Sequence, residues 1–419
     1  MQVGEEVRVH RTALPGFAPF PTWNGTLATA SGARDGRCSL LRENGDLLLL
    51  RYTEDGEKPV LRVEKVLRPP LPSPPASFSQ CWAADGSVFV CARDRHVTVH
   101  DTRRGFAPLL STQLRFSVAT IDIACWSHSA SSDAERVYLL VVGSAFGAFL
   151  HRVTLPGSTN SNQSYDTSSS ASSDAAATGV LPPVAAAYED TPVCVARFSH
   201  DGATVALGTV DGRLFVRQLR RRGPDSALLG AFGAEVFTKV LAAPRVTSIS
   251  FAPCDSKLAA ATRKGNVYVL VRDAEADATA LDAWCLHPPC RELSSNPTPP
   301  PAAAGVAGAM QTLVCWWGSA RSSALVVASR AANYRLELLD AVSGNLVRSV
   351  QVASRRRSAL GDGEASVAPP PAAGDDLLTG VSCVSVPGAD GAARQRLLCH
   401  DTRSSLSVIE WSGLDVWVG

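Results

Sequence analysis

The chain alternates short apolar runs with polar turns, and residues 193–219 (VCVARFSHDGATVALGTVDGRLFVRQL) show this pattern most clearly. Three apolar runs are separated by Asp201-Gly202 and Asp211-Gly212. Both dipeptides favour hairpin turns, because glycine adopts positive φ easily and aspartate bonds back to its own backbone. The middle run, residues 204–209 (TVALGT), is almost entirely apolar, which is typical of a strand covered on both faces. We therefore predict a three-stranded antiparallel meander that packs between other sheets.

The same order of strand, polar turn, strand, short turn and strand recurs along the chain. Four clear copies and two weaker ones accompany the first, and they cover residues 79–101, 122–153, 246–271, 312–340, 23–52 and 380–411. In five units the first strand ends near an aromatic residue: Trp82, Trp126, Phe198, Phe251 and Trp316. A regular succession of seven such units predicts a repeat architecture, in which neighbouring units bury each other's apolar faces.

In this repeat pattern the sequence resembles the WD40-repeat β-propeller family over most of its length. The family ends its third strand in Trp-Asp and carries an aspartate in the turn before it; the matching positions here are His100-Asp101, Leu339-Asp340, Asp94 and Asp211. In other units the dipeptide has diverged, and the Gly-His that usually opens a repeat is absent. The resemblance implies an all-β fold, a seven-bladed WD40-like β-propeller.

We predict a single propeller domain over residues 1–419, with blades at about 20–67, 77–115, 118–154, 191–233, 245–285, 311–353 and 377–411. Four Pro-, Ser- or Ala-rich segments are too poor in apolar side chains to offset their ordering entropy, and we expect disordered inserted loops at 68–76, 155–190, 286–309 and 354–376. Without them, each unit has roughly 47 residues, close to the family's period of about 40–45.

Residues 5–11 (EEVRVHR) precede the first unit and belong to none of the seven units. We predict that they supply the outer strand of the last blade and so close the ring. Closure is expected because it leaves only short, protected sheet edges.

Composition narrows the class of protein further. The 419 residues carry a net charge of +1, so charge alone does not indicate a nucleic-acid partner. Eleven cysteines, an odd number without a short-range framework, are expected to be buried free thiols in a reducing compartment. The N-terminus lacks the apolar core of a signal peptide, and no run of about 18 apolar residues appears. We therefore expect a cytoplasmic or nuclear protein without a membrane span.

The sequence gives no pattern of catalytic residues. The segment 261–266 (ATRKGN) lacks the spacing of a phosphate-binding loop, and Ser144 in GSAFG is misplaced for a nucleophile elbow. Cys285, His287 and Cys290 (CLHPPC) offer three zinc ligands, but a structural site needs four and no Cys-x-x-Cys pair lies nearby. We expect no enzyme activity, no catalytic residues, no metal and no cofactor.

One surface remains as a candidate site. In the WD40 family the turns between second and third strands line the narrow face around the channel, where partners usually dock. Here these turns carry basic or aromatic residues in most units: Arg95, Arg213, Arg263, Lys264, Tyr334, Arg335 and Arg403. The first and third units break the run with residues 43–46 (ENGD) and 145–147 (AFG). We expect a basic face that docks an acidic or phosphorylated segment or a nucleic-acid backbone; the alternative is soluble turn residues neutralised by nearby carboxylates.

The leading interpretation is a non-catalytic scaffold that mediates protein–protein interactions as a subunit of a multiprotein complex. A second hypothesis is a Sec12-like guanine-nucleotide exchange factor for a small GTPase, which would use a Gly-rich first-blade loop comparable to residues 30–36 (ASGARDG). Against it, that family carries a C-terminal membrane anchor, whereas this chain ends in WSGLDVWVG. A third is a nucleic-acid-associated propeller subunit of ribosome biogenesis or transcription, which a steep salt dependence of binding would reveal.

Overall fold

The structure is a computed structural model, and its described residues form a ring of four-stranded sheets. The described ranges are 7–13, 28–29, 37–41, 46–55, 58–68, 77–126, 136–155, 182–220, 231–241, 245–273, 281, 283–286, 312–317, 325–330, 335–351, 378–387, 393–401 and 405–411. Within these ranges the strands form seven antiparallel sheets, and each sheet is one blade. The predicted all-β, seven-bladed propeller is therefore confirmed.

The first four blades contain consecutive strands, ordered in each sheet from the centre to the rim. Blade 1 holds β2 (Ala28–Thr29), β3 (Arg37–Leu41), β4 (Leu47–Asp55) and β5 (Lys58–Leu67). Blade 2 holds β6 (Phe78–Trp82), β7 (Val88–Arg93), β8 (His96–Asp101) and β9 (Ala107–Gln113), with a short 3-10 turn at Thr102–Arg104. Blade 3 holds β10 (Val118–Cys125), β11 (Arg136–Ser144), β12 (Gly147–Leu155) and β13 (Pro183–Ala187). Blade 4 holds β14 (Val193–Phe198), β15 (Thr204–Thr209), β16 (Arg213–Arg220) and β17 (Ala231–Val240).

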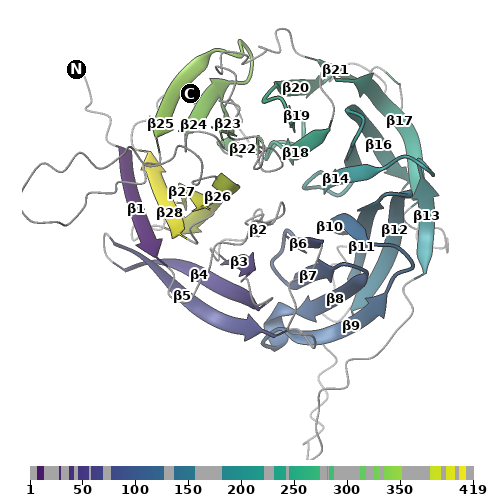
Figure 1. Cartoon of the computed structure of the whole chain (residues 1–419), viewed down its shortest axis with the longest axis horizontal. Helices are drawn as coiled ribbons and strands as arrows, with labels where there is room; N and C mark the ends of the chain where they lie inside the picture. Colours follow the sequence, from purple (N-terminus) through teal and green to yellow (C-terminus); the bar gives the residue numbers. More distant parts are fainter. Residues whose placement is uncertain are drawn as a thin grey trace, which may run out of the picture.

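The remaining blades repeat this order. Blade 5 holds β18 (Val246–Phe251), β19 (Lys257–Thr262), β20 (Val267–Arg272) and β21 (Trp284–Leu286). Blade 6 holds β22 (Val314–Trp317), β23 (Leu325–Arg330), β24 (Arg335–Asp340) and β25 (Leu346–Gln351). Blade 7 holds β26 (Leu378–Pro387), β27 (Ala393–Asp401) and β28 (Ser405–Trp411). In Figure 1 the first strands surround a central opening and the last strands form the rim.

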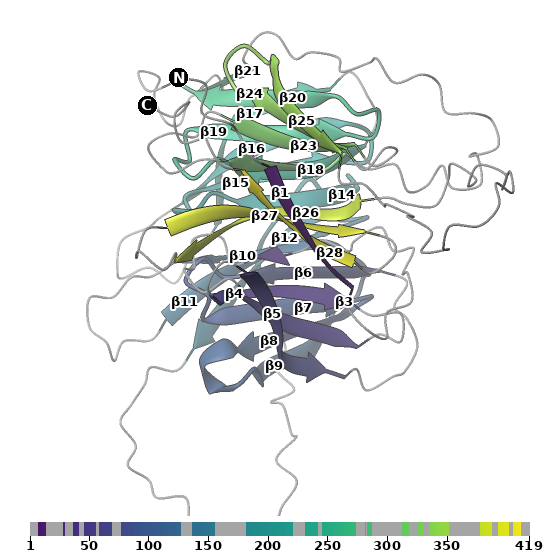
Figure 2. The same ribbon diagram turned by 90° about the vertical axis from the view of Figure 1, so that its left-hand side faces the viewer.

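The ring closes through the N-terminal strand. β1 (Val7–Ala13) is the outer strand of blade 7 and pairs antiparallel with β28, from Val7 opposite Trp411 to Ala13 opposite Ser405. Figure 2 shows β1 alongside β28. This strand begins and ends two residues later than the segment 5–11 that the sequence indicated. Because the two ends of the chain share one sheet, β28 has no open edge along this register.

One predicted loop contains a strand. Residues 155–190 were expected to be an inserted loop, but their last part forms β13, which pairs with β12. β13 is the outermost strand of blade 3 and most of it is exposed, so its sequence (PVAAA) lacks the apolar run of an inner strand. A proline is compatible with such an edge position because it has one unpaired side. The rest of the predicted loops lies outside the described residues, in the ranges 69–76, 156–181, 287–311 and 352–377.

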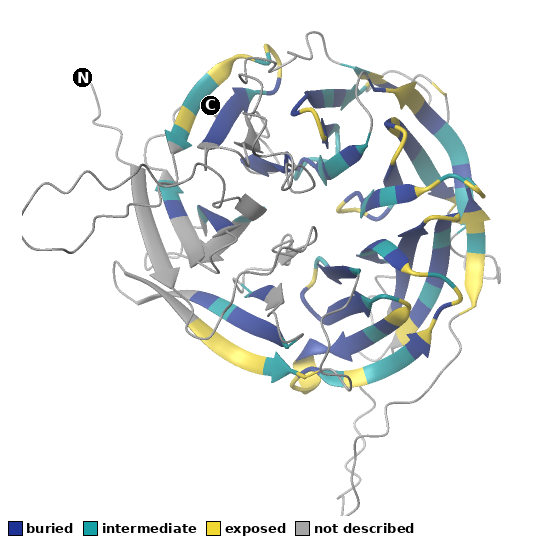
Figure 3. Ribbon diagram, in the orientation of Figure 1, coloured by how far each residue is buried: buried dark blue, intermediate teal, exposed yellow. Residues whose placement is uncertain are grey.

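The core lies between neighbouring blades. Every residue of β15 is buried, as predicted for the apolar run TVALGT, and β7 and β19 are buried almost throughout. Figure 3 shows this buried layer inside an exposed rim. Between blades 2 and 3, for example, Val90 and Val99 belong to the same cluster as Ile121 and Leu140. Each blade therefore buries its two faces against the blades on either side, which explains why second strands are apolar rather than alternating.

Small polar side chains join the first strands of successive blades. Ile121 N donates to Ser79 Oγ (3.0 Å), Phe198 N donates to Asp122 Oδ2 (2.7 Å) and Val314 N donates to Ser248 Oγ (3.2 Å). A first strand has no further strand on its channel side, so the N–H groups on that side need acceptors other than a neighbouring strand. These side chains supply them, and they fix each blade against the next.

Candidate functional site

The turns between second and third strands lie on one face of the ring, together with the connections that lead into first strands. In blade 2, Asp94 N donates to Ser77 O (2.9 Å), and Val118 N of the next blade donates to Asp94 O (2.7 Å). In blade 4, Val210 N donates to Pro192 O (3.1 Å), and Arg245 N donates to Val210 O (2.9 Å). We call this surface the turn face. Its backbone bonds fix the turns of neighbouring blades relative to each other.

Four of the predicted site residues are exposed on the turn face. Arg95 belongs to the turn of blade 2, Arg213 follows the turn of blade 4, and Arg263 and Lys264 form the turn of blade 5. Arg335 is the first residue of β24, and its side chain lies outside the described part of the chain, as do Tyr334 and Arg403. The structure thus places cations from three blades on the same face.

Local carboxylates offset part of this charge. Arg213 Nε lies 2.9 Å from Asp211 Oδ2, and both side chains are about half exposed (50% and 48%). Asp211 also accepts a hydrogen bond from the Thr209 hydroxyl, which holds the carboxylate in the turn. Arg95 and Lys264 form no ion pair with any other described residue. The alternative of neutralised turn residues therefore applies to Arg213 and not to these two cations.

The turn of blade 3, which interrupts the basic run, exposes an aromatic ring instead. Phe146 is 57% exposed and lies 6.5 Å, between ring centroids, from Phe116 in the connection between blades 2 and 3. In the sequence, residues 145–147 interrupt the run of basic turns, and the charge pattern gave no indication of this exposed ring. The signal that could have found it was an aromatic residue at the tip of a short turn, where burial is least expected.

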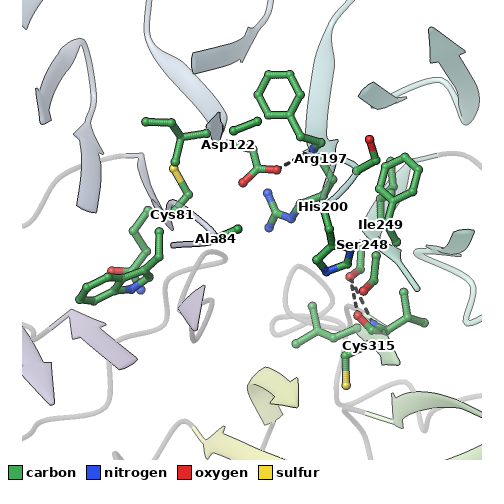
Figure 4. Close-up of a pocket in the computed structure, with 18 of the residues that line it drawn as sticks. Cys81, Ala84, Asp122, Arg197, His200, Ser248, Ile249 and Cys315 are labelled. Atoms are coloured by element: carbon green, nitrogen blue, oxygen red, sulfur yellow. Dashed lines mark hydrogen bonds between the residues drawn. The ribbon is translucent and has the colours of Figure 1, made fainter. Parts of the chain in front are cut away.

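A cavity of about 180 Å³ opens in the channel near its other end, away from the turn face. First strands of several blades line it, and Figure 4 shows Asp122, Arg197 and His200 directed toward it. His200 lies in the turn after β14, at the opposite end of that strand from Pro192 and the turn face. Strand patterns alone did not reveal this site, because its residues come from separate repeats.

The charged groups of the cavity are fixed by hydrogen bonds. Burial raises the pKa of the Asp122 carboxyl, although the nearby Arg197 guanidinium opposes the shift. Burial lowers the pKa of His200, but the hydrogen bond to Asp255 and the negative charge of that carboxylate outweigh it, so the pKa is raised overall. His200 Nδ1 lies 2.8 Å from Asp255 Oδ1. The cavity therefore combines both signs of charge.

The thiols beside the cavity are poor nucleophiles. Burial raises the pKa of Cys81 and of Cys315 well above the ordinary value, and the Asp122 carboxylate adds to the effect at Cys81. A protonated thiol neither attacks electrophiles nor binds metal readily. Both cysteines therefore serve as small apolar core residues.

Several other sequence hypotheses fall partly outside the described residues. Cys285 is exposed on β21, but His287 and Cys290 lie outside, as does the loop 30–36 of the exchange-factor hypothesis. Among the described residues, no group of three or more His, Cys, Asp or Glu side chains is arranged to hold a metal ion. No helix in that part of the chain is long and apolar enough to cross a membrane.

The ring of four-stranded antiparallel blades, closed by its N-terminal strand, defines the chain as a β-propeller. Among solved structures it is similar to the β-propeller domain of Cps50 (Swd1) from Myceliophteria thermophila, with 12% sequence identity, a TM-score of 0.54 and coverage of 97% of this chain and 99% of that one. A chain of a mitotic checkpoint complex aligns with 12% identity, a TM-score of 0.49 and coverage of 96% and 90%. No family model and no curated protein matches the sequence. The likeness to the Cps50 (Swd1) domain thus agrees with the predicted β-propeller fold.

Proposed function

We propose that this protein is a non-catalytic scaffold that holds other proteins together as a subunit of a multiprotein complex. The observation that carries the proposal is the turn face, where hydrogen-bonded turns of three blades present Arg95, Arg213, Arg263 and Lys264 to solvent. A rigid surface loses little conformational entropy on binding, so its contacts convert efficiently into affinity. The fold itself is compatible with many functions and adds support only by analogy.

The expected partner segments are acidic or phosphorylated. Exposed guanidinium and ammonium groups attract carboxylate or phosphate groups over a distance and form charge-assisted hydrogen bonds on contact. The whole molecule is nearly neutral, at a net charge of +1, so the attraction must come from the local arrangement of these cations and not from the total charge.

We place this function in the cytoplasm or nucleus. The described residues include ten free cysteines, five of them buried, and none forms a disulfide within that part of the chain. A chain so rich in unpaired thiols suits a reducing compartment.

The test is purification of the tagged full-length protein from its own cells, at low and at high salt, with the co-purifying proteins identified by mass spectrometry. The variant R95E/R213E/K264E should lose at least one specific partner without a change in its thermal unfolding midpoint. A matched control, R62E/R104E/R220E, carries the same charge change on exposed arginines outside the described turns of the turn face and should keep all partners.

Three results would contradict the scaffold. The first is an identical set of partners for wild type and R95E/R213E/K264E. The second is loss of every partner after nuclease treatment, and the third is recovery of a single GTPase that is enriched when EDTA removes its nucleotide. The second result would favour the nucleic-acid hypothesis, and the third would favour the exchange factor.

A further inference from the structure

An aromatic cluster lies on the turn face where blades 2 and 3 meet. Phe116 stacks on Phe149, with ring centroids 4.6 Å apart and an interplanar angle of 22°. Phe146 extends the cluster at 6.5 Å from Phe116 and is 57% exposed. A large apolar ring at a turn tip contributes little to the core, because most of its surface stays in water.

The connection that carries Phe116 is tied to the turn of blade 2 at both ends. Leu114 N donates to Arg95 O (2.8 Å), and Val118 N donates to Asp94 O (2.7 Å). Leu114 and Val118 are themselves buried. The connection therefore projects Arg115 and Phe116 from two fixed points, directly beside Arg95.

The turn that carries Phe146 is equally constrained. Ser144 pairs with Gly147 across a two-residue turn, and Phe146 N donates to the buried Ser144 Oγ (3.0 Å). Gly147 has φ +119°, and a Cβ there would lie 2.8 Å from the carbonyl oxygens of Ala187 and Tyr188. Only glycine fits this position, so the backbone of the turn that carries Phe146 has little freedom to change.

Two exposed arginines belong to the turn of blade 2 and to the connection that carries Phe116. Arg95 is in that turn and Arg115 directly precedes Phe116, and neither forms an ion pair with a described residue. The neighbouring carboxylate of Asp94 is engaged, because it accepts a hydrogen bond from Ser77 N (2.8 Å). Arg95, Arg115, Phe116 and Phe146 together form what we call the aromatic–arginine patch.

We propose that the aromatic–arginine patch binds a short acidic segment of a partner protein through an aromatic or leucine side chain of that segment. Its apolar anchor packs against Phe116 and Phe146, while Asp or Glu residues on either side pair with Arg95 and Arg115. Aromatic and arginine side chains are enriched at protein interfaces. Two arginines around one apolar spot fit a peptide better than a nucleic-acid strand, which needs a longer basic track. This inference rests on the proposed scaffold function and names the partner chemistry.

The test begins with a display library of random dodecapeptides, selected on the immobilised full-length protein. Selected sequences should combine an aromatic residue or leucine with flanking acidic residues. A synthetic peptide of the most enriched sequence is then labelled, and its affinity is measured by fluorescence anisotropy. F146A should weaken binding roughly tenfold or more, as expected for an interface anchor. The variant R95Q/R115Q, and a peptide with its acids changed to amides, should weaken binding and remove its salt dependence.

A matched control is V342A, which truncates another exposed apolar residue (54% exposed) in the turn after β24, at the other end of that strand from the second-to-third turn. It should bind the peptide as wild type does. Three outcomes would overturn the inference: no enrichment over blank resin, enriched peptides that lack either the acids or the apolar anchor, or equal affinity for wild type and F146A. Tighter binding of labelled oligo-dT than of any selected peptide would overturn it in favour of nucleic acid. If F146A fails to weaken binding while R95E/R213E/K264E still loses its partners, the patch is wrong and the scaffold stands.

Discussion

At the residue scale, two glycines control how closely neighbouring blades approach. A Cβ at Gly143 would lie 2.9 Å from Val193 Cγ1, and one at Gly208 would lie 2.6 Å from Val246 Cβ. Both glycines occur near the end of a second strand, where the first strand of the next blade packs against it. Here it is the absence of a side chain, rather than free φ, that the packing requires.

We predict that G208A destabilises the fold by about 1–3 kcal/mol, because the added methyl group must displace Val246 in a closely packed core. The measurement is the free energy of unfolding in urea. V246A alone should also be destabilising because it leaves a cavity, but G208A/V246A should be more stable than the two single effects predict. Additive effects in this cycle would show that the two residues do not compete for the same space.

His100 is near the end of β8, at the position that the sequence matched to the tryptophan of the WD40 repeat. Its side chain is buried, and Nδ1 donates a hydrogen bond to Phe106 O (3.2 Å). Burial lowers the pKa of His100 to about 4. The unfolded chain therefore binds a proton at this side chain between pH about 6.5 and about 4, whereas the folded chain does not.

Stability that depends on His100 should thus be complete above pH about 6.5 and fall as the pH drops toward about 4. H100N should show a shallower acid-side decline in the free energy of unfolding than wild type, although it is less stable at neutral pH. NMR titration of the imidazole checks the pKa directly. A His100 that titrates near the ordinary value would contradict the buried, neutral imidazole.

At the element scale, blades 4 and 5 are joined by their first turns on the face opposite the turn face. Asp255, at φ +54°, accepts hydrogen bonds from His200 N (2.8 Å) and Asp201 N (2.9 Å) and lies beside the His200 ring. Asp122 and Asp201 add negative charge near the ring. One carboxylate therefore fixes the turn of the neighbouring blade.

The pKa of His200 is raised in the folded state, so the pH dependence of the stability that it contributes is opposite to that of His100. Stability from the His200–Asp255 pair should be fully present below the unfolded pKa of about 6.5 and disappear as the pH rises through the higher folded value. Between these values, the difference in unfolding free energy between wild type and H200Q should shrink with rising pH. A difference that is constant over this range would show that the imidazole does not titrate against Asp255.

At the scale of the whole molecule, β1 closes the ring by completing the last blade. The strand pairs along its entire length with β28, so the last blade contains both ends of the described chain. A propeller without this strand would expose the edge of β28 to other chains.

We predict that V9P/H10P destabilises the fold by about 1–3 kcal/mol, because successive N–H groups of a strand point to opposite sides and one of the two prolines therefore removes a donor to β28. The measurement is the thermal unfolding midpoint together with size-exclusion chromatography, which should reveal association through the freed edge. V3P, placed before β1, is the control and should behave as wild type. Equal stability of both variants would mean that β1 does not hold the ring closed.

The alternation of apolar runs with polar turns determined the strand order and the seven units, because those properties depend on neighbours along the chain. The unbroken apolar run TVALGT also indicated that β15 is buried on both faces, although neighbouring blades provide that burial. The sequence also indicated which residues occupy the second-to-third turns, including Arg95 and Lys264. It could not place β13, whose pairing to β12 rather than its own composition makes it a strand. Nor could it bring Phe116 to Phe146, or Asp122 and Arg197 to one cavity, since those meetings depend on how blades pack around the ring. Local pattern is set by nearest neighbours in sequence, whereas a binding surface is assembled from separate repeats and exists only once the ring has closed.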